Sequence, residues 1–298
     1  MTMMMSKIIV VVGPTATGKT KVSIELAKKF NAVIINADST QVYSEPLIAT
    51  AKIKEEEKEG IEHYLFDIVS LNDDYTLYAY QKDGRKLLDK FIKENRNVVI
   101  VGGSGLYIKA LLYDYKLEET DIKRVDYSEY SNKELKDIAD NIDENNKIHV
   151  NNRQRLERYI TFYNETGSTI NKTEDINKRV YDFDIIGLKA NREELYDRIN
   201  KRVDEMFDDG LLEEAKRLYE KHYKKYSSII GYSELEKYFK NEISLEEAKE
   251  LLKRDTRRYA KRQFTWFNNQ MKDITWFDVD YNNFNNTLHK IYDYFEKK

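Results

Sequence analysis

The sequence predicts an α/β fold built on a doubly wound parallel sheet. Runs of β-branched residues alternate with amphipathic helical segments, and polar or glycine-rich residues follow each run. The clearest runs lie at 7–13, 32–39 and 97–105. Ligands bind at the carboxyl ends of the strands in sheets of this class. We therefore expect the polar loops after these strands to converge on one site; they are residues 13–20, 36–41 and 102–107.

Helical periodicity connects the predicted strands. Segment 19–30 has its apolar residues on one stripe, and segment 75–95 has the same period. A further strand is expected at 181–190, and two long helices follow it. The stripe of the first long helix consists of Leu195, Ile199, Val203 and Met206. The second begins at Ser244, where Ser244 and Glu247 form a capping box.

The composition shifts near Asp114. The stretch that follows is polar and charged, without a clear buried strand, and it predicts a small helical insertion or a mobile flap. A helix ending at Gly167 is expected after it. We therefore divide the chain into a core, residues 1–113 and 151–298 with a helical C-terminal part, and an insertion at 114–150.

Bulk composition narrows the class of protein. The chain has 298 residues, no cysteine and a net charge of −3. Disulfides, thiolate zinc sites and cysteine nucleophiles are excluded, and a reducing cytoplasm fits. No apolar run approaches the roughly 20 residues of a membrane helix, so we expect a soluble cytoplasmic protein. The net charge alone argues mildly against a nucleic-acid partner, although a local basic face would suffice for one.

Residues 13–20 form a phosphate-binding motif. The stretch GPTATGKT matches G-x-x-x-x-G-K-[ST] between a buried strand and an amphipathic helix. Its glycines let backbone N–H groups converge on an anion, Lys19 supplies a cation, and the Thr20 hydroxyl suits Mg²⁺. We expect the whole loop to bind a diphosphate or polyphosphate: Gly13, Pro14, Thr15, Ala16, Thr17, Gly18, Lys19 and Thr20. The motif is typical of nucleotide-binding proteins, but it does not by itself specify ATP.

Asp38 follows the second predicted strand and is expected near the phosphate loop. A carboxylate there could hold Mg²⁺ through water, take a proton from a substrate, or cap the next turn. An ordinary NTPase carries its metal-directing Asp after a later apolar strand. Here that strand ends in Gly102, Gly103 and Ser104, which weakens an ATPase interpretation.

Two segments are candidates for contact with nucleic acid. RQRLERY, residues 153–159, places Gln154 and Arg158 on one helical face, although Arg153 and Glu157 could equally form a solvated ion pair. Six of the ten residues from 253 to 262 are basic. This second face could meet RNA phosphates or a diphosphate, and it consists of Arg254, Arg258 and Lys261. We expect the aromatic residues beside it to belong to the core rather than to stack on bases; they are Tyr259, Phe264, Trp266 and Phe267.

The chain resembles the tRNA dimethylallyltransferases, also called the tRNA isopentenyltransferase or IPP transferase family. Five stretches carry the resemblance, in family order: GPTATGKT, NADSTQVY, VVIVGGSGLYIKALL, NNRQRLERYI and TRRYAKRQFTWF. The segments RVDEMFDDGLLEEAKRL and IIGYSEL also resemble the C-terminal helices of the family. The resemblance extends over nearly the whole chain.

The resemblance implies a P-loop NTPase-like fold and a prenyl transfer reaction. Members transfer a dimethylallyl group from dimethylallyl diphosphate to N6 of the adenine on the 3′ side of the tRNA anticodon. The phosphate loop would then hold the diphosphate as a leaving group, with Lys19 and Mg²⁺ stabilising its charge. Asp38 would be the base. Ser104, in place of the usual Thr, would contact the substrate near the reacting centre.

The resemblance also implies the residues that meet tRNA. The target base would have to flip out of the RNA to be reached. The implied contacts come from the second loop, the third loop, the QRLER motif and the basic segment: Asp38, Ser39, Thr40, Gln41, Ser104, Gln154, Arg155, Leu156, Glu157, Arg158, Arg254, Arg258 and Lys261. The insertion at 114–150 would contribute to the grip on tRNA.

The sequence departs from the family pattern in places. The residues before the QRLER motif are Val-Asn-Asn rather than Pro-Asn-Asp, and Ala49 stands where the family usually has Gly. The insertion looks shorter than usual. These departures bear on affinity for tRNA and on the choice of tRNA.

Other functions remain open at this point. An enzyme that prenylates free adenine nucleotides would share the phosphate loop and Asp38, but would not need the basic C-terminal segment. A P-loop kinase would bind ATP and carry an arginine-rich lid. A non-catalytic RNA-binding protein with a relic loop would not need Lys19, Thr20, Asp38 and Ser104 together. We expect a monomer, because a tRNA presents one asymmetric target.

Overall fold

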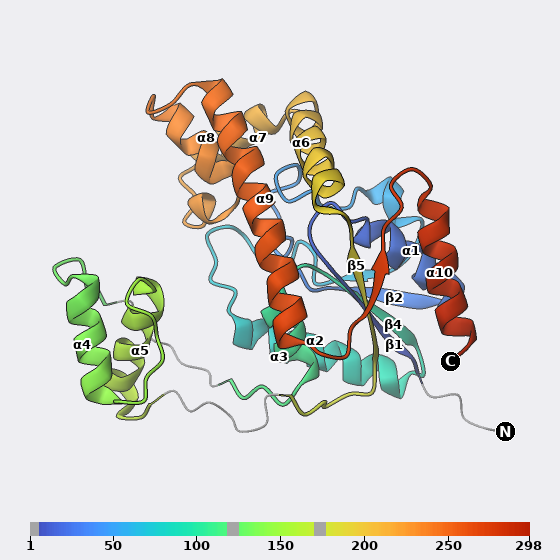
Figure 1. The fold of residues 1–298 in the computed structure, drawn as a ribbon, viewed down its shortest axis with the longest axis horizontal. Coiled ribbons are helices and arrows are strands. Elements are labelled where there is room, and N and C mark those ends of the chain that lie inside the picture. The colour runs from blue at the N-terminus through green and yellow to red at the C-terminus, as the bar shows by residue number, and fades with distance from the viewer. Residues whose placement is uncertain (1–5, 118–124, 170–176) are drawn as a thin grey trace. The chain divides into compact units, whose positions relative to one another are not determined.

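The computed structural model describes residues 6–117, 125–169 and 177–298. These residues form two compact units (Figure 1). The core unit contains residues 1–113 and 179–298, and the insertion unit contains residues 114–178.

The described part of the core unit contains a six-stranded sheet in which every pair of neighbours is parallel, in the order β3-β2-β4-β1-β5-β6. The doubly wound α/β prediction is confirmed. The strands are β1 (Ile8–Val12), β2 (Ala32–Asn36), β3 (His63–Tyr64), β4 (Asn97–Val101), β5 (Asp184–Lys189) and β6 (Thr275–Asp278). Two strands were not predicted from the sequence: β3, which has two residues, and β6, which is half-exposed at the sheet edge.

Both faces of the sheet are covered by helices. Helices α1 (Lys19–Phe30) and α10 (Phe284–Glu296) lie on one face, where they bury Ile9 and Val11 of the central strand. Helices α2 (Leu77–Lys93) and α3 (Gly105–Leu112) lie on the other face (Figure 1). Alternate residues of one strand therefore enter two separate cores, which explains the unbroken apolar run in its sequence. Helix α10 was not predicted.

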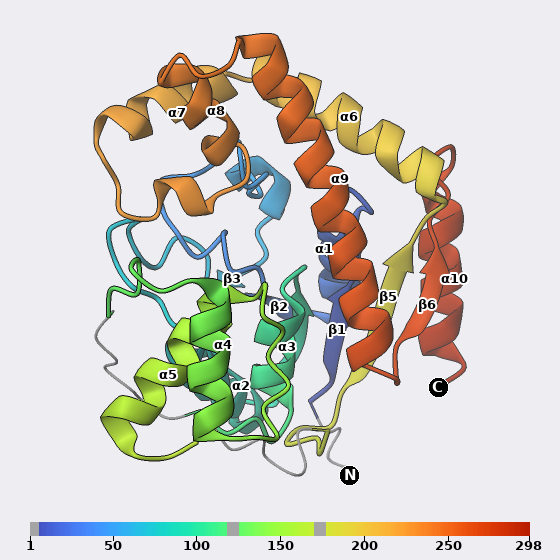
Figure 2. The ribbon, with the colours of Figure 1, turned by 60° about the vertical axis from the view of Figure 1, so that its left-hand side comes forward.

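The C-terminal part is helical, as predicted (Figure 2). Its helices are α6 (Arg192–Asp208), α7 (Leu211–Glu220), α8 (Tyr232–Phe239) and α9 (Leu245–Gln270). A short 3₁₀ turn, η2 (Tyr226–Ser228), lies between α7 and α8, and another, η1 (Glu55–Lys58), lies between β2 and β3. The predicted capping box at the start of α9 is present, with the Ser244 hydroxyl accepting from the backbone N–H of Glu247. No helix within the described residues is long and apolar enough to cross a membrane.

The insertion unit is a helical pair. Helix α4 (Asn132–Ile142) packs on α5 (Arg153–Thr166), which ends at Gly167 as expected. Their shared core includes Leu135, Leu156 and Ile160. The boundary predicted at residue 150 is therefore wrong, because α5 completes the core of the insertion instead of joining the sheet. The unit ends at residue 178.

The chain leaves and re-enters the core unit through two adjacent segments. Tyr113 and Arg179 form an antiparallel bridge, and the N–H of Val180 donates to the carbonyl of Leu112 at 2.9 Å. The Arg85 guanidinium donates to the carbonyl of Tyr113 at 2.6 Å and to two carbonyls at the end of α3. This neck, residues 112–113 and 179–180, is thus bonded to α2 and fixed within the core unit.

Candidate active site

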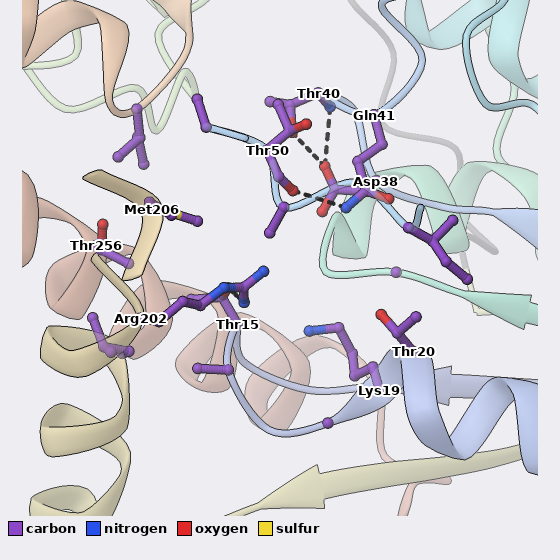
Figure 3. A pocket seen from close by; sticks show the side chains of 18 of the residues that line it. Thr15, Lys19, Thr20, Asp38, Thr40, Gln41, Thr50, Arg202, Met206 and Thr256 are labelled. Carbon is purple, nitrogen blue, oxygen red and sulfur yellow. Dashed lines mark hydrogen bonds between the residues drawn. The ribbon is translucent and has the colours of Figure 1, made fainter. Parts of the chain in front are cut away.

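The core unit contains a cavity of about 800 Å³ at the carboxyl ends of β1, β2 and β4 (Figure 3). Two walls of this cavity carry the polar groups. The strand-end wall consists of the loops at 13–20, 36–41 and 102–105, which converge as predicted. The helical wall consists of residues from α6 and α9, including Arg198, Arg202, Tyr259 and Gln263.

The phosphate loop has the backbone conformation that anion binding requires. Gly13 has φ +143°, and a Cβ there would lie 2.5 Å from the Leu188 carbonyl oxygen, so only glycine fits. Ala16 and Gly18 are also left-handed, with φ of +65° and +85°. Such alternation of backbone conformation turns successive N–H groups toward one point. The Thr17 side chain is fully buried and donates to the Pro14 carbonyl, so it supports the loop from behind.

Lys19 lies at the start of α1 and extends over the phosphate loop. Its ammonium donates to the Pro14 carbonyl at 2.7 Å. Burial lowers the pKa of Lys19 to about 8, with Arg202 lowering it further and the Asp38 charge opposing the shift. The side chain is therefore a cation at neutral pH, but one whose charge is poorly solvated. A bound diphosphate would stabilise the charged form of Lys19, which burial has deprived of solvent.

Asp38 has one engaged and one free carboxylate oxygen. Its Oδ1 accepts from the N–H and the hydroxyl of Thr40, at 3.0 and 2.7 Å. Its Oδ2 accepts no hydrogen bond from any residue that the structure describes, and the carboxylate lines the cavity facing Lys19 and Arg202 (Figure 3). The cap interpretation is confirmed for one oxygen. The other oxygen is available for a ligand or a proton, so capping of the turn does not exclude either of the other two interpretations of Asp38.

Ser104 connects the second and third loops. Its hydroxyl accepts from the N–H of Ser39 at 2.9 Å and bonds to the Ser39 hydroxyl at 3.0 Å. Ser104 is the N-cap residue of α3, yet its side chain makes no capping bond. The hydroxyl is therefore used to hold the segment next to Asp38. Ser39, Thr40 and Asp38 line the cavity, whereas Ser104 stands behind them.

The helical wall supplies two groups that analysis of the sequence missed. The Arg202 guanidinium lies 3.4 Å from the Thr15 hydroxyl, and burial lowers its pKa, as does nearby Arg198. Gln263 is buried; its Oε1 accepts from the N–H of Thr15 at 2.8 Å, and its Nε2 donates to the Gly103 carbonyl at 3.1 Å. One side chain of α9 thus joins the phosphate loop to the third loop.

Weak signals for these residues exist in the sequence. Arg198 and Arg202 are four residues apart, at the edge of the apolar stripe of α6. Gln263 is a polar residue on the buried stripe of α9, between Ala260 and Phe267. Each pattern marks a residue that faces inward, but neither indicates which loop it meets.

A third part of the cavity comes from Ala49, Thr50 and Ala51, in the segment 47–51. A buried carboxylate, Glu214 of α7, accepts from the consecutive N–H groups of residues 47–49 and from the Tyr232 hydroxyl at 2.6 Å. The next residue, Thr50, accepts at its carbonyl from the Gln41 side chain at 3.0 Å. The helices α7 and α8 therefore position this segment opposite the phosphate loop. Ala49, in the usual glycine position, is held by the same carboxylate.

The predicted tRNA residues on α5 divide by exposure. Gln154, Arg155 and Arg158 are exposed, as a binding face requires. Leu156 is wrong as a contact residue, because its side chain is fully buried in the core of the insertion unit. Glu157 forms the alternative ion pair with Arg153 at 2.7 Å.

The basic face of α9 is exposed as predicted. Arg254, Arg258 and Lys261 all reach solvent, and Asp255 pairs with the two arginines. The core assignment of the neighbouring aromatic residues is confirmed for Phe267 and wrong for Phe264, which is 38% exposed. Trp266 is half-buried, and Tyr259 lines the cavity. Burial and the Asp38 charge raise the pKa of the Tyr259 hydroxyl.

The groups available for Mg²⁺ are few but suitable. No cluster of three or more His, Cys, Asp or Glu side chains that could hold a metal occurs within the described ranges. The exposed Thr20 side chain and the Asp38 carboxylate both line the cavity. Mg²⁺ commonly keeps several waters and binds through one or two protein oxygens together with substrate phosphates. The donor set fits a metal of that kind.

The fold and the site define a phosphate-loop enzyme of the α/β class, with a cation-lined cavity and an available carboxylate. The comparisons with known proteins identify the family. Residues 41–270 match the model of the family described as IPP transferase. The chain belongs to that family.

Relatives extend over nearly the whole chain. It is 45% identical to a protein of Anoxybacillus flavithermus named tRNA dimethylallyltransferase, over 98% of this chain and 97% of the relative. Among solved structures, it is similar to the tRNA isopentenylpyrophosphate transferase of Bacillus halodurans, with 36% identity, a TM-score of 0.74, and coverage of 98% and 96%. A eukaryotic dimethylallyltransferase acting on tRNA aligns with a TM-score of 0.78 and 26% identity, covering 96% of this chain and 77% of the other.

Proposed function

We propose that this enzyme transfers the dimethylallyl group of dimethylallyl diphosphate to N6 of the adenine next to the 3′ side of the anticodon in tRNA. One observation carries the proposal. Lys19 and Arg202 face the free oxygen of Asp38 across a single cavity (Figure 3). Two cations beside a phosphate loop suit a diphosphate, and a carboxylate opposite them suits an amine that must lose a proton.

The leaving group is held by the phosphate loop. As the C1–O bond of the donor breaks, negative charge grows on the bridging oxygen of the diphosphate. The loop N–H groups, Lys19 and Arg202 stabilise that charge without reorganisation, because the loop is already folded and bonded to Gln263. The carbon moves and the diphosphate stays intact, which distinguishes the reaction from phosphoryl transfer by a kinase.

Asp38 takes the proton. The adenine N6 forms a bond to C1 of the dimethylallyl group and loses one hydrogen, which passes to Oδ2 of Asp38. The two bonds from Thr40 to Oδ1 hold the carboxylate in place for this step. Lys19 and Arg202 lie across the cavity from Oδ2, and this oxygen accepts no hydrogen bond from any described residue, so it is open to the incoming proton.

We propose Mg²⁺ as the cofactor. The Thr20 hydroxyl would hold it together with oxygens of the diphosphate. The metal would neutralise part of the charge on the leaving group.

Binding of tRNA is assigned to the two exposed faces. Arg254, Arg258 and Lys261 on α9 meet phosphates, and Gln154 with Arg158 on α5 meets the anticodon stem-loop. The target adenine flips into the cavity. Ser39, Thr40 and Gln41 line the cavity wall next to Asp38, where the adenine would lie. We further propose that the enzyme acts as a monomer in the cytoplasm, since one tRNA presents one asymmetric target.

A product assay tests the proposal. The purified chain is incubated with Mg²⁺, labelled dimethylallyl diphosphate and, in parallel, unmodified tRNA, AMP or ATP. The products are digested to nucleosides and analysed by mass. We expect N6-dimethylallyladenosine in tRNA and none from the free nucleotides.

Other outcomes of this assay would point to a different acceptor, ligand or target adenine. Label in AMP or ATP would place the acceptor among free nucleotides. Consumption of ATP without prenyl transfer would mean that the phosphate loop holds a nucleotide. Modification at another adenine of the tRNA would retain the reaction and refute the anticodon-adjacent target.

A further inference from the structure

The turn between β6 and α10, residues 279–284, lies against the phosphate loop and outside the cavity. Two of its side chains make the contacts. The Tyr281 hydroxyl donates to the carbonyl of Ala16 at 3.1 Å. The Phe284 ring lies 2.6 Å from the position that a Cβ on Gly18 would occupy. Neither residue lines the cavity, and both follow the 41–270 segment that matches the family model.

The bonded residue is the strained one. Ala16 has φ +65° inside the phosphate loop, a conformation that costs free energy in any residue with a side chain. The conformation persists only if surrounding contacts favour it. The Tyr281 bond fixes the Ala16 carbonyl, and the Phe284 ring covers Gly18, the next left-handed residue of the loop. Tyr281 and Phe284 thus contact Ala16 and Gly18, two left-handed residues of the loop, whose conformation turns its N–H groups toward the anion site.

The turn is rigid enough to act as a support. Asp280 accepts from the N–H groups of Asn282 and Asn283 at 3.0 and 2.8 Å, and from the Asn286 side chain at 2.9 Å. The N–H of Val279 donates to the carbonyl of Lys189, which continues the pairing of β6 with β5. The turn is therefore anchored to the sheet on one side and to α10 on the other.

A basic side chain lies over each of the two rings. The Arg198 guanidinium lies 5.5 Å from the centre of the Tyr281 ring, and the Lys21 ammonium lies 5.0 Å from that of Phe284. Both basic residues also line the cavity. Each ring therefore contacts the phosphate loop and also a basic residue that lines the cavity.

We propose that Tyr281 and Phe284 are positioning residues that hold the phosphate loop in its anion-binding conformation. The inference rests on the proposed role of this loop as a diphosphate site. Inorganic pyrophosphate is the probe, because it tests the loop without any assumption about the prenyl group or tRNA.

The first test is Tyr281→Phe, measured by calorimetric titration with pyrophosphate and Mg²⁺. Loss of one hydrogen bond should weaken pyrophosphate binding by about three- to tenfold. In the transfer assay, the KM for dimethylallyl diphosphate should rise by a similar factor, with kcat and the KM for tRNA unchanged. Tyr292→Phe is the matched control, because its hydroxyl bonds to Glu25 of α1 rather than to the loop, at 3.1 Å.

A second substitution separates positioning from general destabilisation. In an Ala16→Gly background the left-handed conformation carries no side-chain penalty. The loss caused by Tyr281→Phe should then shrink to less than about twofold. Phe284→Ala, which uncovers Gly18, should weaken pyrophosphate binding in the same direction as Tyr281→Phe.

The outcomes are distinct. Equal pyrophosphate binding by the wild-type chain and by Tyr281→Phe would overturn the positioning role and leave the proposed function intact. A loss that persists at full size in the Ala16→Gly background, or that appears equally in kcat and in tRNA binding, would also overturn it. If the wild-type chain binds no pyrophosphate, both the diphosphate site and this inference fail.

Discussion

The two walls of the cavity are built in different ways. The strand-end wall comes from three short contiguous stretches, each with a recognisable sequence motif, and some of its bonds are local, such as that from the Thr17 hydroxyl to the Pro14 carbonyl. The helical wall comes from single residues of α6 and α9, each far along the chain from the loop it meets. Gln263 bonds to a residue 248 positions away. The motifs therefore carry most of the polar groups of the cavity, whereas the dispersed residues add Arg202 and, through Gln263, join two of the loops.

The largest effect should come from the strand-end wall, at Asp38. Asp38→Asn keeps the shape of the side chain and removes the base, so turnover should fall by about 100- to 10,000-fold. The affinity for tRNA, measured by filter binding, should be retained. Thr40→Val, which removes one bond to Oδ1 but leaves Oδ2, should lose far less turnover. An equal collapse of tRNA binding and turnover in Asp38→Asn would show that Asp38 is not the base.

Arg202 of the helical wall should affect the charge of Lys19 in the strand-end wall, and this effect should be visible in the pH dependence of pyrophosphate binding. With a pKa of about 8, Lys19 is charged below that pH and loses its charge above it. Pyrophosphate affinity should therefore fall as the pH rises above about 8, by at most about tenfold per unit for the loss of this one charge. Because Arg202 lowers the pKa of Lys19, Arg202→Gln should move this fall to higher pH, although it weakens binding overall. A fall that stays at the same pH in the variant would contradict the coupling.

A smaller effect is expected from the helical wall at Gln263. Gln263→Leu leaves the Thr15 N–H and the Gly103 carbonyl without their partner, which should lower the free energy of unfolding by about 1 to 3 kcal/mol. The KM for the donor should rise several-fold as the phosphate loop loosens. Chemical denaturation and steady-state kinetics measure the two effects. Gln270→Leu, at the exposed end of the same helix, is the control. Unchanged stability in Gln263→Leu would mean that the two walls are not joined there.

The smallest effect is expected from Ser104→Thr. The hydroxyl that bonds to Ser39 is kept and one methyl group is added at a half-buried position. The value of kcat/KM should change by less than about threefold, whereas Ser104→Ala should lose more because Ser39 then lacks its partner. A larger loss in the Thr variant than in the Ala variant would mean that space, rather than the hydroxyl, matters at this position.

Much of the fold and of the strand-end wall could be predicted from the sequence, for a physical reason. The buried parallel strands and the phosphate loop are encoded by contiguous residues whose periodicity and glycine spacing have few alternatives. Arg202 and Gln263 were missed because their partners are determined by the packing of distant helices. Leu156 was assigned to tRNA because a motif match does not say which of its residues face inward. The domain boundary failed for a related reason, since the periodicity of α5 does not reveal its packing partner.

The neck at 112–113 and 179–180 has a consequence for how such a protein can change over time. Because the two ends of the insertion leave the core side by side and are bonded to each other and to α2, the length between them does not affect the sheet. Residues can be lost or gained in the insertion at the small entropic cost of a different loop length. The core unit and the insertion are thus free to evolve at different rates within one chain.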